Sequence, residues 1–401
     1  MLAPAGNAEK LEIAIHYGAD AVYLGGKDFS LRNFSGNFQP DEMKNGVQLA
    51  HDHGVKVYVT CNIFPRNHEL EGISDFLASL NQIKPDGVII ADPGVFLLAR
   101  EKAPDIPIHI SVQANNTSLQ SALFWEKMGA VRINTARELS LEEISHIASC
   151  TRMEIESFAH GAMCVSYSGR CLLSSFLSGR DANRGACSQP CRWKYAVMEE
   201  QRPGQYLPVD EDARGTYIFN SKDLCMIDHI PEMIHAGIDC LKIEGRMKGI
   251  NYLASAVRVY RAAIDRYYDD PKGWAADPRW KDELSGISNR DYCAGFYFGD
   301  PEQTSLNRKQ SKSETDRIFI GKALGPGPGD MTRVEARNKF FVNDTVEALT
   351  RKGPLRHDIV KKIITENGEE ADCVQPSSHV TILFENRYEK NDIIRKKISQ
   401  Q

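Results

Sequence analysis

The sequence has no uncharged apolar run of the roughly 20 residues that a membrane-spanning helix requires. Its longest apolar runs, such as 87–90 and 95–99, have the length of a strand or of part of a helix. The first residues also lack the basic start, the long apolar stretch and the cleavage site of a secretory signal. We therefore expect a cytoplasmic protein that is not integral to a membrane.

An excess of one charge is also missing, because 49 Lys and Arg stand against 54 Asp and Glu, a net charge of −5. The chain thus has no overall basic character of the kind that marks many nucleic-acid-binding domains. It also lacks recognisable serine- and metallopeptidase motifs such as Gly-x-Ser-x-Gly and His-Glu-x-x-His. A cysteine peptidase pair stays open, because His160 lies four residues before Cys164.

Short β-rich runs alternate with helical patterns from the start of the chain to about residue 266. This alternation predicts parallel strands joined by crossover helices. A closed, TIM-like (β/α) barrel of eight units fits the length, and a doubly wound sheet is the alternative. Nine strand candidates compete for eight places, so one is an insertion or a cap. The weakest candidates are Leu2 to Ala5 and Thr216 to Asn220.

The length of 401 residues predicts one large domain and a smaller one. We expect the α/β barrel to occupy residues 1–268, with a cysteine loop inserted at 159–195. A polar, irregular pattern at 269–316 predicts a linker or arm. From 317 to 401 short alternating runs separated by turns predict a small antiparallel β-barrel domain.

Four of the ten cysteines fall between positions 164 and 191, at Cys164, Cys171, Cys187 and Cys191. They follow the predicted strand 153–158, and in α/β folds the loops after strand ends form the functional face. Stable disulfides are rare in a reducing compartment, and four thiolates on one loop can converge on a metal or a cluster. Zinc sites generally use close cysteine pairs. The irregular spacing therefore favours an iron-sulfur cluster over zinc, with unmetallated thiols as the third interpretation.

The stretch from Glu156 to Cys164, followed by Gly-Arg-Cys-Leu-Leu-Ser at 169–174, resembles the signature of the U32, or collagenase-like, peptidase family. The resemblance covers about residues 2–300 and includes Gly18 to Gly25 and Lys242 to Arg246. The motifs at 179–185 and 192–195 are most similar to the branch that hydroxylates the wobble uridine of tRNA. That branch is linked to prephenate, and a resemblance to it implies tRNA and this small anionic metabolite as partners.

The resemblance implies an oxygen-independent hydroxylation factor, with formation of 5-hydroxyuridine, rather than the peptidase of the family name. It implies a four-iron four-sulfur cluster on Cys164, Cys171 and Cys187. The fourth ligand is Cys191, which we favour, or Cys225. A peptidase acting on collagen or unfolded chains and a non-catalytic RNA-binding scaffold remain the alternatives. The remaining cysteines are predicted to be buried packing residues: Cys61, Cys150, Cys240, Cys293 and Cys373.

A local basic group surrounds the cysteines despite the negative net charge, and its arginines are candidates for binding substrate: Arg170, Arg180, Arg184 and Arg192. Guanidinium groups suit bidentate contacts with a tRNA phosphate or with a dicarboxylate such as prephenate. Alternatively, they pair with Asp181 or neutralise the thiolates. Trp193 or Tyr195 could stack on a base.

Lys242, Glu244 and Arg246 alternate at the end of the last predicted strand, so they can face the mouth of the barrel. With His160 they are the catalytic candidates. A second group occupies comparable strand ends: Gln113, Asn115, Arg137, Glu138, Asn220 and Asp223. The His51-Asp52-His53 sequence precedes its strand and is predicted to be a solvated helix end. A homodimer is the assembly that we expect.

Overall fold

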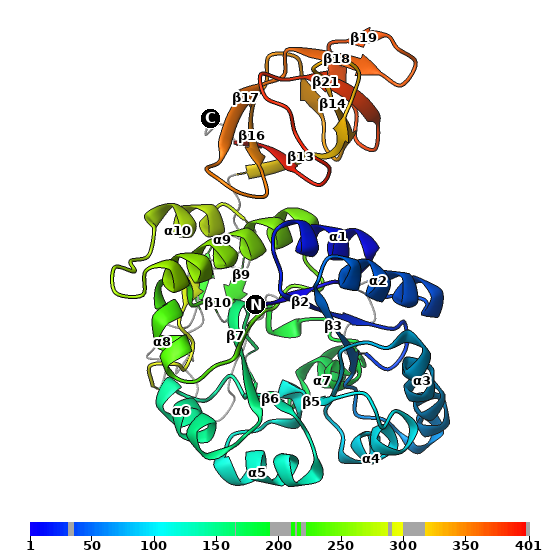
Figure 1. Cartoon of the computed structure of the whole chain (residues 1–401), viewed down its shortest axis with the longest axis vertical. Coiled ribbons are helices and arrows are strands. Elements are labelled where there is room, and N and C mark those ends of the chain that lie inside the picture. The colour runs from blue at the N-terminus through cyan, green and yellow to red at the C-terminus, as the bar shows by residue number, and fades with distance from the viewer. Residues whose placement is uncertain are drawn as a thin grey trace.

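The computed structural model describes residues 1–30, 36–164, 166–192, 210–212, 215–217, 222–287, 291–299 and 317–397. Within these ranges the chain forms a (β/α) barrel followed by a smaller β domain (Figure 1). None of the helices in these ranges is both long and apolar enough to cross a bilayer.

Eight parallel strands close the barrel, because β11 pairs with both β1 and β7. The strands are β1 (Leu2–Pro4), β2 (Ala21–Gly25), β3 (Lys56–Cys61), β4 (Gly87–Ile90), β5 (Ile108–Ile110), β6 (Arg132–Asn134), β7 (Glu154–Ala162) and β11 (Cys240–Ile243). The predicted TIM-like barrel is therefore confirmed, and the doubly wound sheet is excluded.

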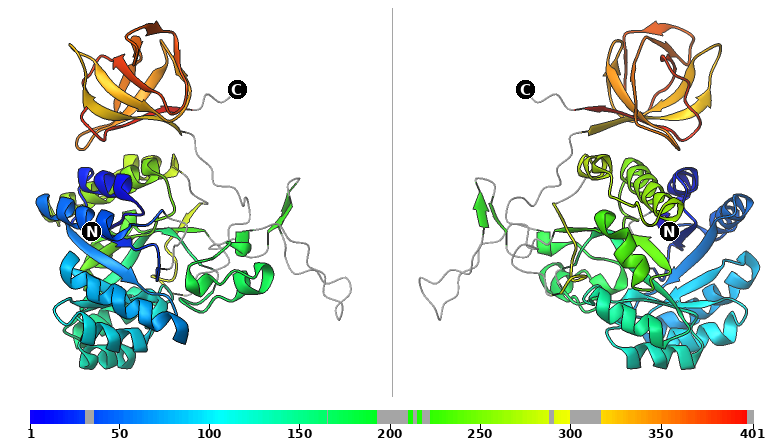
Figure 2. Two further views of the ribbon diagram at one scale, coloured as in Figure 1. Left: turned by 90° about the vertical axis from the view of Figure 1, so that its right-hand side faces the viewer. Right: turned by 60° about the vertical axis from the view of Figure 1, so that its left-hand side comes forward.

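Helices surround this sheet, as Figures 1 and 2 show. They are α1 (Ala8–His16), α2 (Pro40–Asp52), α3 (Leu70–Ile83), α4 (Pro93–Lys102), α5 (Leu119–Met128), α6 (Leu141–Cys150), α8 (Ile230–His235) and α9 (Ile250–Asp269). Local sequence sets their ends: the Asn7 side chain accepts a hydrogen bond from Lys10 N at the start of α1, and Gly129, with φ of 98°, ends α5.

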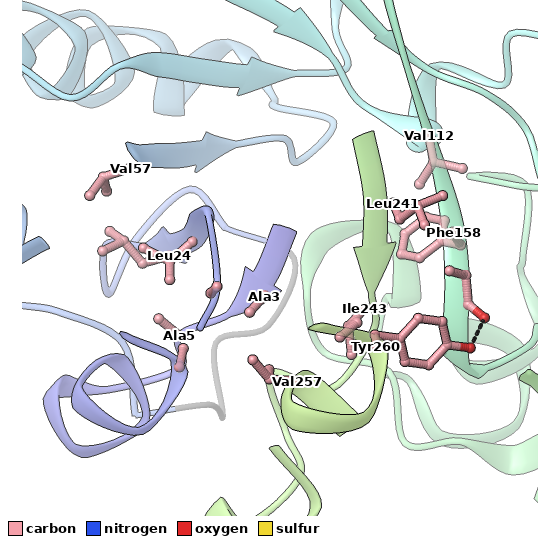
Figure 3. Close-up of a cluster of buried hydrophobic side chains, with 14 of the residues drawn as sticks. Ala3, Ala5, Leu24, Val57, Val112, Phe158, Leu241, Ile243, Val257 and Tyr260 are labelled. Carbon is pink, nitrogen blue, oxygen red and sulfur yellow. Dashed lines mark hydrogen bonds between the residues drawn. The ribbon is translucent and has the colours of Figure 1, made fainter. Parts of the chain in front are cut away.

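Alternation along each strand divides the core into two parts. In β2, for example, Val22 and Leu24 point outward and pack with the helices, whereas Ala21 and Tyr23 point into the barrel. Figure 3 shows part of the larger hydrophobic cluster, in which the Tyr260 hydroxyl of α9 donates to Ala159 O of β7 at 2.7 Å. A helix thus holds the strand from which the cysteine loop departs.

The structure shows which of the two weakest strand candidates belongs to the barrel. Leu2 to Ala5 supplies β1 of the barrel. Of Thr216 to Asn220, residues 216–217 lie in β9 (Gly215–Tyr217), which pairs with β8 (Asp210–Asp212) in a separate two-stranded sheet, and 218–220 lie outside the described residues. The sheet also gains β10 (Asp223–Cys225), which runs antiparallel to β7, and β12 (Tyr292–Cys293).

Residues 269–299 are more regular than the predicted linker, where they are described. They contain α10 (Pro278–Ser285) and β12, and Tyr297 is buried with its hydroxyl 2.5 Å from Phe158 O. The helix begins after Asp277, whose side chain accepts from Arg279 N, with Pro278 at the first position. The helix is short and polar, so these signals at its start were not recognised in the sequence. Residues 288–290 and 300–316 lie outside the described part.

The C-terminal domain is a curved antiparallel sheet with its own apolar core, so the predicted antiparallel β architecture is confirmed. It is a half-barrel, with β17 and β19 as its edges. The strands of this sheet are β13 (Arg317–Pro326), β14 (Thr332–Ala336), β16 (Thr345–Leu349), β17 (Arg356–Ile359), β18 (Lys362–Thr365), β19 (Glu370–Ala371), β21 (His379–Leu383) and β22 (Ile393–Lys397). In the same domain β15 (Phe340–Phe341) and β20 (Cys373–Val374) pair with each other in a separate two-stranded sheet.

This domain contacts the barrel through a buried ion pair and shared core residues. Arg395, fully buried, donates to both carboxylate oxygens of Glu283 on α10 at 2.5 and 2.9 Å. Burial raises the pKa of Glu283, but the hydrogen bond and charge of Arg395 outweigh it and lower the pKa to about 2. Leu349 and Ile393 belong to the hydrophobic core of the barrel. The two domains therefore share one packed interface.

Replacing Arg395 by Met should lower the free energy of unfolding by about 3–5 kcal/mol, because it leaves a buried carboxylate short of its main partner. Urea denaturation of the full chain measures this loss. The double variant Arg395→Met with Glu283→Met should recover much of the stability, since neither charge is then buried alone. A double variant as unstable as the single one would show that packing, rather than the ion pair, holds the interface.

Candidate functional site

A small polar pocket lies at the carboxyl ends of the barrel strands, where TIM-like barrels carry their active sites. Its volume is about 60 Å³, which admits only a few water molecules. Its lining comes from seven of the eight barrel strands or the loops after them: Tyr23, Thr60, Asn62, Ile89, Ser111, Val112, Gln113, Arg137, Phe158, Lys242, Glu244 and Arg246. Larger groups must therefore contact the rim of this pocket.

The Lys242 ammonium forms the floor of the pocket. Its Nζ donates to Glu156 Oε1 at 2.8 Å and lies 4.4 Å from the centre of the Tyr23 ring. Glu156 also accepts from Asn134 Nδ2 at 2.8 Å, and the Arg132 guanidinium lies 3.6 Å from its second oxygen. Burial raises the pKa of Glu156, but the charges of Lys242 and Arg132 outweigh it and hold this pKa below its usual range. The floor is therefore a compensated, buried charge network.

Glu244 and Arg246 occupy the wall above this floor. Glu244 accepts from Arg137 Nη2 at 3.3 Å, and the Arg137 guanidinium lies 3.9 Å from the centre of the Phe158 ring. Arg246 is buried and donates to Thr60 Oγ1 at 3.0 Å and Ser30 Oγ at 2.8 Å. The prediction that Lys242, Glu244 and Arg246 share the mouth is confirmed in position. Arg246 also ties the loop after β2 to the rim.

Sequence reasoning missed Glu156 and Tyr23, which complete the floor. A signal was present, because Glu154 and Glu156 interrupt the strand 153–158 at the same parity as Phe158, and of these two carboxylates Glu156 is the buried one. Tyr23 carried no such signal, since a tyrosine in a buried strand is ordinary core. Only barrel closure brings it next to Lys242.

His160 lies away from this pocket, on the outer side of β7. Its ring packs against the rings of Tyr252, Tyr260 and Tyr292 at centroid distances of 5.3–5.8 Å. Burial lowers the pKa of His160 to about 4, so the ring is neutral. No described hydrogen bond joins it to Cys164. The structure thus gives the predicted catalytic histidine an aromatic surrounding rather than a nucleophile.

The cysteine loop leaves β7 at Ala162 and folds back over the rim. It contains α7 (Leu173–Ser178), and it is fixed by two carboxylates of the barrel. Glu138 accepts from Ser168 N at 2.7 Å, and Glu69 pairs with Arg184 Nη2 at 2.5 Å. Gly169 approaches so closely that a Cβ there would lie 2.2 Å from Gln113 O. The loop therefore packs directly on a residue that lines the pocket.

The thiols of this loop are accessible: Cys164 is exposed, and Cys171, Cys187 and Cys191 are half-buried. Cys164 and Cys171 contact each other, and their hydrogen bond lowers the pKa of Cys171 to about 5 while it raises that of Cys164. No group of three or more potential metal ligands meets among the described residues. The donor set nevertheless fits a sulfur-bound metal group, because four reachable thiols share one anchored loop.

The alternative ligand, Cys225, belongs to β10 and lies beside His160 in the strand pairing. Its sulfur accepts from the Tyr260 hydroxyl at 3.9 Å, and burial raises its pKa to about 11.

Of the five predicted packing cysteines, Cys61 and Cys240 are buried. Cys293 and Cys373 are half-buried, and Cys150 is exposed at the end of α6, where the chain turns before β7. The packing prediction for Cys150 is therefore wrong.

The four predicted substrate-binding arginines have different surroundings. Arg170 and Arg180 are exposed, and Arg180 Nε donates to Ala186 O at 3.0 Å. Arg184 pairs with Glu69 rather than with the predicted Asp181, which instead accepts from Asn183 N at 2.9 Å as a helix cap. The Arg192 side chain, and the whole of residues 193–195, lie outside the described part.

Of the second group of strand-end residues, Gln113 and Arg137 line the pocket, and Glu138 anchors the cysteine loop. Asn115, with φ of 54°, and Asp223, buried in β10, do not line it. Asn220 lies outside the described residues. His51 and His53 are exposed at the end of α2, as predicted.

Replacing Gly169 by Ala should displace the cysteine loop, because the new Cβ would overlap Gln113 O. Gly179→Ala, in the same loop and also at positive φ, is the matched control, since nothing lies within 4 Å of its Cβ position. Both variants lose about 1–2 kcal/mol of local conformational free energy. Only Gly169→Ala should also speed tryptic cleavage within 166–192. Equal cleavage of the two variants would contradict the close packing of the turn on the barrel.

The chain is similar over nearly its whole length to known proteins. It is 39% identical over 399 residues to the "tRNA hydroxylation protein P1" of Bacillus subtilis, which covers 99% of this chain and 94% of that protein. It is 38% identical over 396 residues to the "tRNA hydroxylation protein P" of Escherichia coli, with 88% and 87% covered. It is 30% identical over 336 residues to a "Collagenase" of Porphyromonas gingivalis, with 81% and 79% covered.

Two family matches divide the chain as the structure does. Residues 6–307 match Peptidase family U32, and residues 315–395 match the Peptidase family U32 C-terminal domain. The first range contains the barrel after β1 together with its cysteine loop, and the second contains almost all of the antiparallel sheet. The chain therefore belongs to peptidase family U32, as its sequence motifs predicted.

Proposed function

We propose that this protein hydroxylates the wobble uridine of tRNA to 5-hydroxyuridine in the cytoplasm, without molecular oxygen. The observation that carries the proposal is the anchoring of the thiol loop on Gln113, at the rim of the polar pocket. This arrangement puts accessible sulfur donors beside a charged site at the functional end of the barrel. The similarity to proteins named for tRNA hydroxylation supports the choice of reaction.

The protein is an enzyme or a component of one, as its relatives' names indicate. We propose that Cys164, Cys171, Cys187 and Cys191 hold a four-iron four-sulfur cluster. Such a cluster supplies electron transfer at a potential that its surroundings set. Support for Cys191 over Cys225 comes from position, because Cys191 shares the anchored loop whereas Cys225 lies in β10 against Tyr260.

The pocket residues provide the polar chemistry. The Lys242 ammonium lies at the floor, paired with Glu156 at 2.8 Å. Glu244 and Arg137 form a pair at the rim that a substrate can open, since their 3.3 Å contact is not fully buried. We propose that one carboxylate of prephenate contacts these cations. The volume of about 60 Å³ allows only part of such a metabolite to enter.

A peptidase acting on collagen-like or unfolded chains is the second candidate, favoured by the 30% identity to a collagenase. No described contact joins Cys164 to His160, because His160 packs among tyrosines. The cysteine–histidine contact that the structure does describe, Cys150 Sγ to His146 Nδ1 at 4.0 Å, lies exposed on α6, outside the polar pocket. Cleavage of gelatin by the purified protein, at a rate that cysteine substitutions leave unchanged, would favour this candidate. A non-catalytic RNA-binding scaffold would bind tRNA and leave the wobble uridine unmodified.

Cells that carry Cys164→Ala together with Cys171→Ala should lose 5-hydroxyuridine, because both substitutions remove proposed cluster ligands. Mass spectrometry of tRNA nucleosides measures this loss. Protein purified without oxygen should contain iron and sulfide, and the double variant should contain far less. Cys150→Ala, an exposed cysteine outside the loop, is the control. Retained hydroxylation in the double variant, with no iron in the wild type, would refute the cluster.

Single substitutions should separate the two contenders for the fourth ligand. Cys191→Ser should reduce bound iron and hydroxylation by about the 10- to 100-fold typical of an impaired metal site. Cys225→Ser should retain most of both. Iron analysis and tRNA nucleoside analysis of the same two strains make the comparison. The reverse result would make Cys225 the ligand.

A further inference from the structure

Residues 167–170 form a tight turn between the first two thiols of the cysteine loop. Arg170 N donates to Tyr167 O at 3.0 Å, and Gly169 has a φ of 73°. A four-residue turn with a glycine at positive φ in its third position is a type II turn. Its two ends, Tyr167 and Arg170, are therefore close neighbours.

Two contacts fix this turn on the barrel. Ser168 is 8% exposed, and both its amide and its hydroxyl donate to the Glu138 carboxylate. Gly169 lies against Gln113 O, with no room for a side chain. The two central residues of the turn thus point toward the barrel. The two outer residues are consequently held in place without being buried themselves.

The outer residues offer an aromatic face and a cation to solvent. The Tyr167 side chain is 64% exposed, and Leu172, next to Cys171, is 69% exposed. Arg170 is exposed, and no ion pair to its guanidinium occurs in the part of the chain that the structure describes. A large exposed aromatic ring held rigidly beside a cation requires an explanation, because burial of such a ring is normally favourable.

An unpaired nucleotide matches this pair of groups. Proteins that read single-stranded RNA stack its splayed bases on aromatic rings and contact its phosphates with arginine. The adjacent pocket, at about 60 Å³, is too small for a base, so a base next to the thiols must lie on the rim.

We propose that Tyr167 stacks an unpaired base of the RNA substrate and that Arg170 contacts a neighbouring backbone phosphate. This inference rests on the proposed function and names the residues that position the RNA. They are positioning residues, since neither supplies a reacting group. The turn would hold the RNA loop beside Cys164 and Cys171, where the redox chemistry is proposed.

Binding of an anticodon stem-loop RNA with uridine at the wobble position tests the stack by fluorescence anisotropy. Tyr167→Ala should weaken binding by about 5- to 100-fold, the loss expected when one base–aromatic stack is removed. Tyr167→Phe keeps the ring and should bind within about 2-fold of the wild type. Tyr268→Ala is the matched control, because Tyr268 is 67% exposed at the far end of α9.

Salt dependence tests the phosphate contact. Arg170→Gln should reduce the slope of log affinity against log salt by about 0.7, the contribution of one phosphate contact to a single strand. Tyr167→Ala should leave that slope unchanged. A fully paired RNA hairpin should show no dependence on Tyr167, because its bases are not available to stack. The thermal unfolding of every variant should match the wild type, since both side chains are exposed.

The outcomes separate this inference from the proposed function. Equal RNA affinities for Tyr167→Ala and Tyr268→Ala would overturn the stack, whatever the tRNA nucleosides show. A second outcome combines two results: RNA binding depends on Tyr167, but cells that lack the protein still modify the wobble uridine. It would support the stack and refute the proposed function. Absence of RNA binding by the wild type, or Tyr167-dependent binding of a gelatin peptide instead, would overturn the inference.

Discussion

Closure of the barrel between β7 and β11 is the constraint on which the rest of the structure depends. The register of this pair shifts between Lys242 and Ile243, so that Phe158 and His160 are paired with consecutive residues of β11. This irregularity keeps Phe158 inside the barrel and places His160 among tyrosines outside it. Tyr260 and Tyr297 donate to the carbonyls of Ala159 and Phe158 at this point. The strand that starts the cysteine loop is therefore held from both sides.

The distribution of charge inside the barrel follows from the same closure. A lone buried lysine or glutamate would be strongly unfavourable, but β7 and β11 place Lys242 and Glu156 within hydrogen-bonding distance. The net charge of −5 gives no indication of this arrangement, nor of the exposed arginines on the cysteine loop. Local charge, rather than the average, is what a polar substrate would meet.

Much of the fold could be predicted from the sequence, because alternating strands and helices admit few topologies. The mouth residues Lys242 and Glu244 could be predicted from strand alternation alone. Their partners Glu156 and Arg137 come from distant segments, and only the closed sheet brings them together. The aromatic surrounding of His160 was unpredictable for the same reason, since it depends on a shift in strand register. The helix α10 was missed because eight residues carry too weak a periodic signal.

Helix α9 contacts both the barrel and the C-terminal domain. Along its 20 residues, Tyr260 faces β7, while Ser255 and Arg258 face the C-terminal domain, where they bond Arg395 and Thr350 O. One rigid element is thus packed against both the base of the cysteine loop and the second domain. Through this helix the small domain is linked by direct contacts to the strand from which the cysteine loop departs.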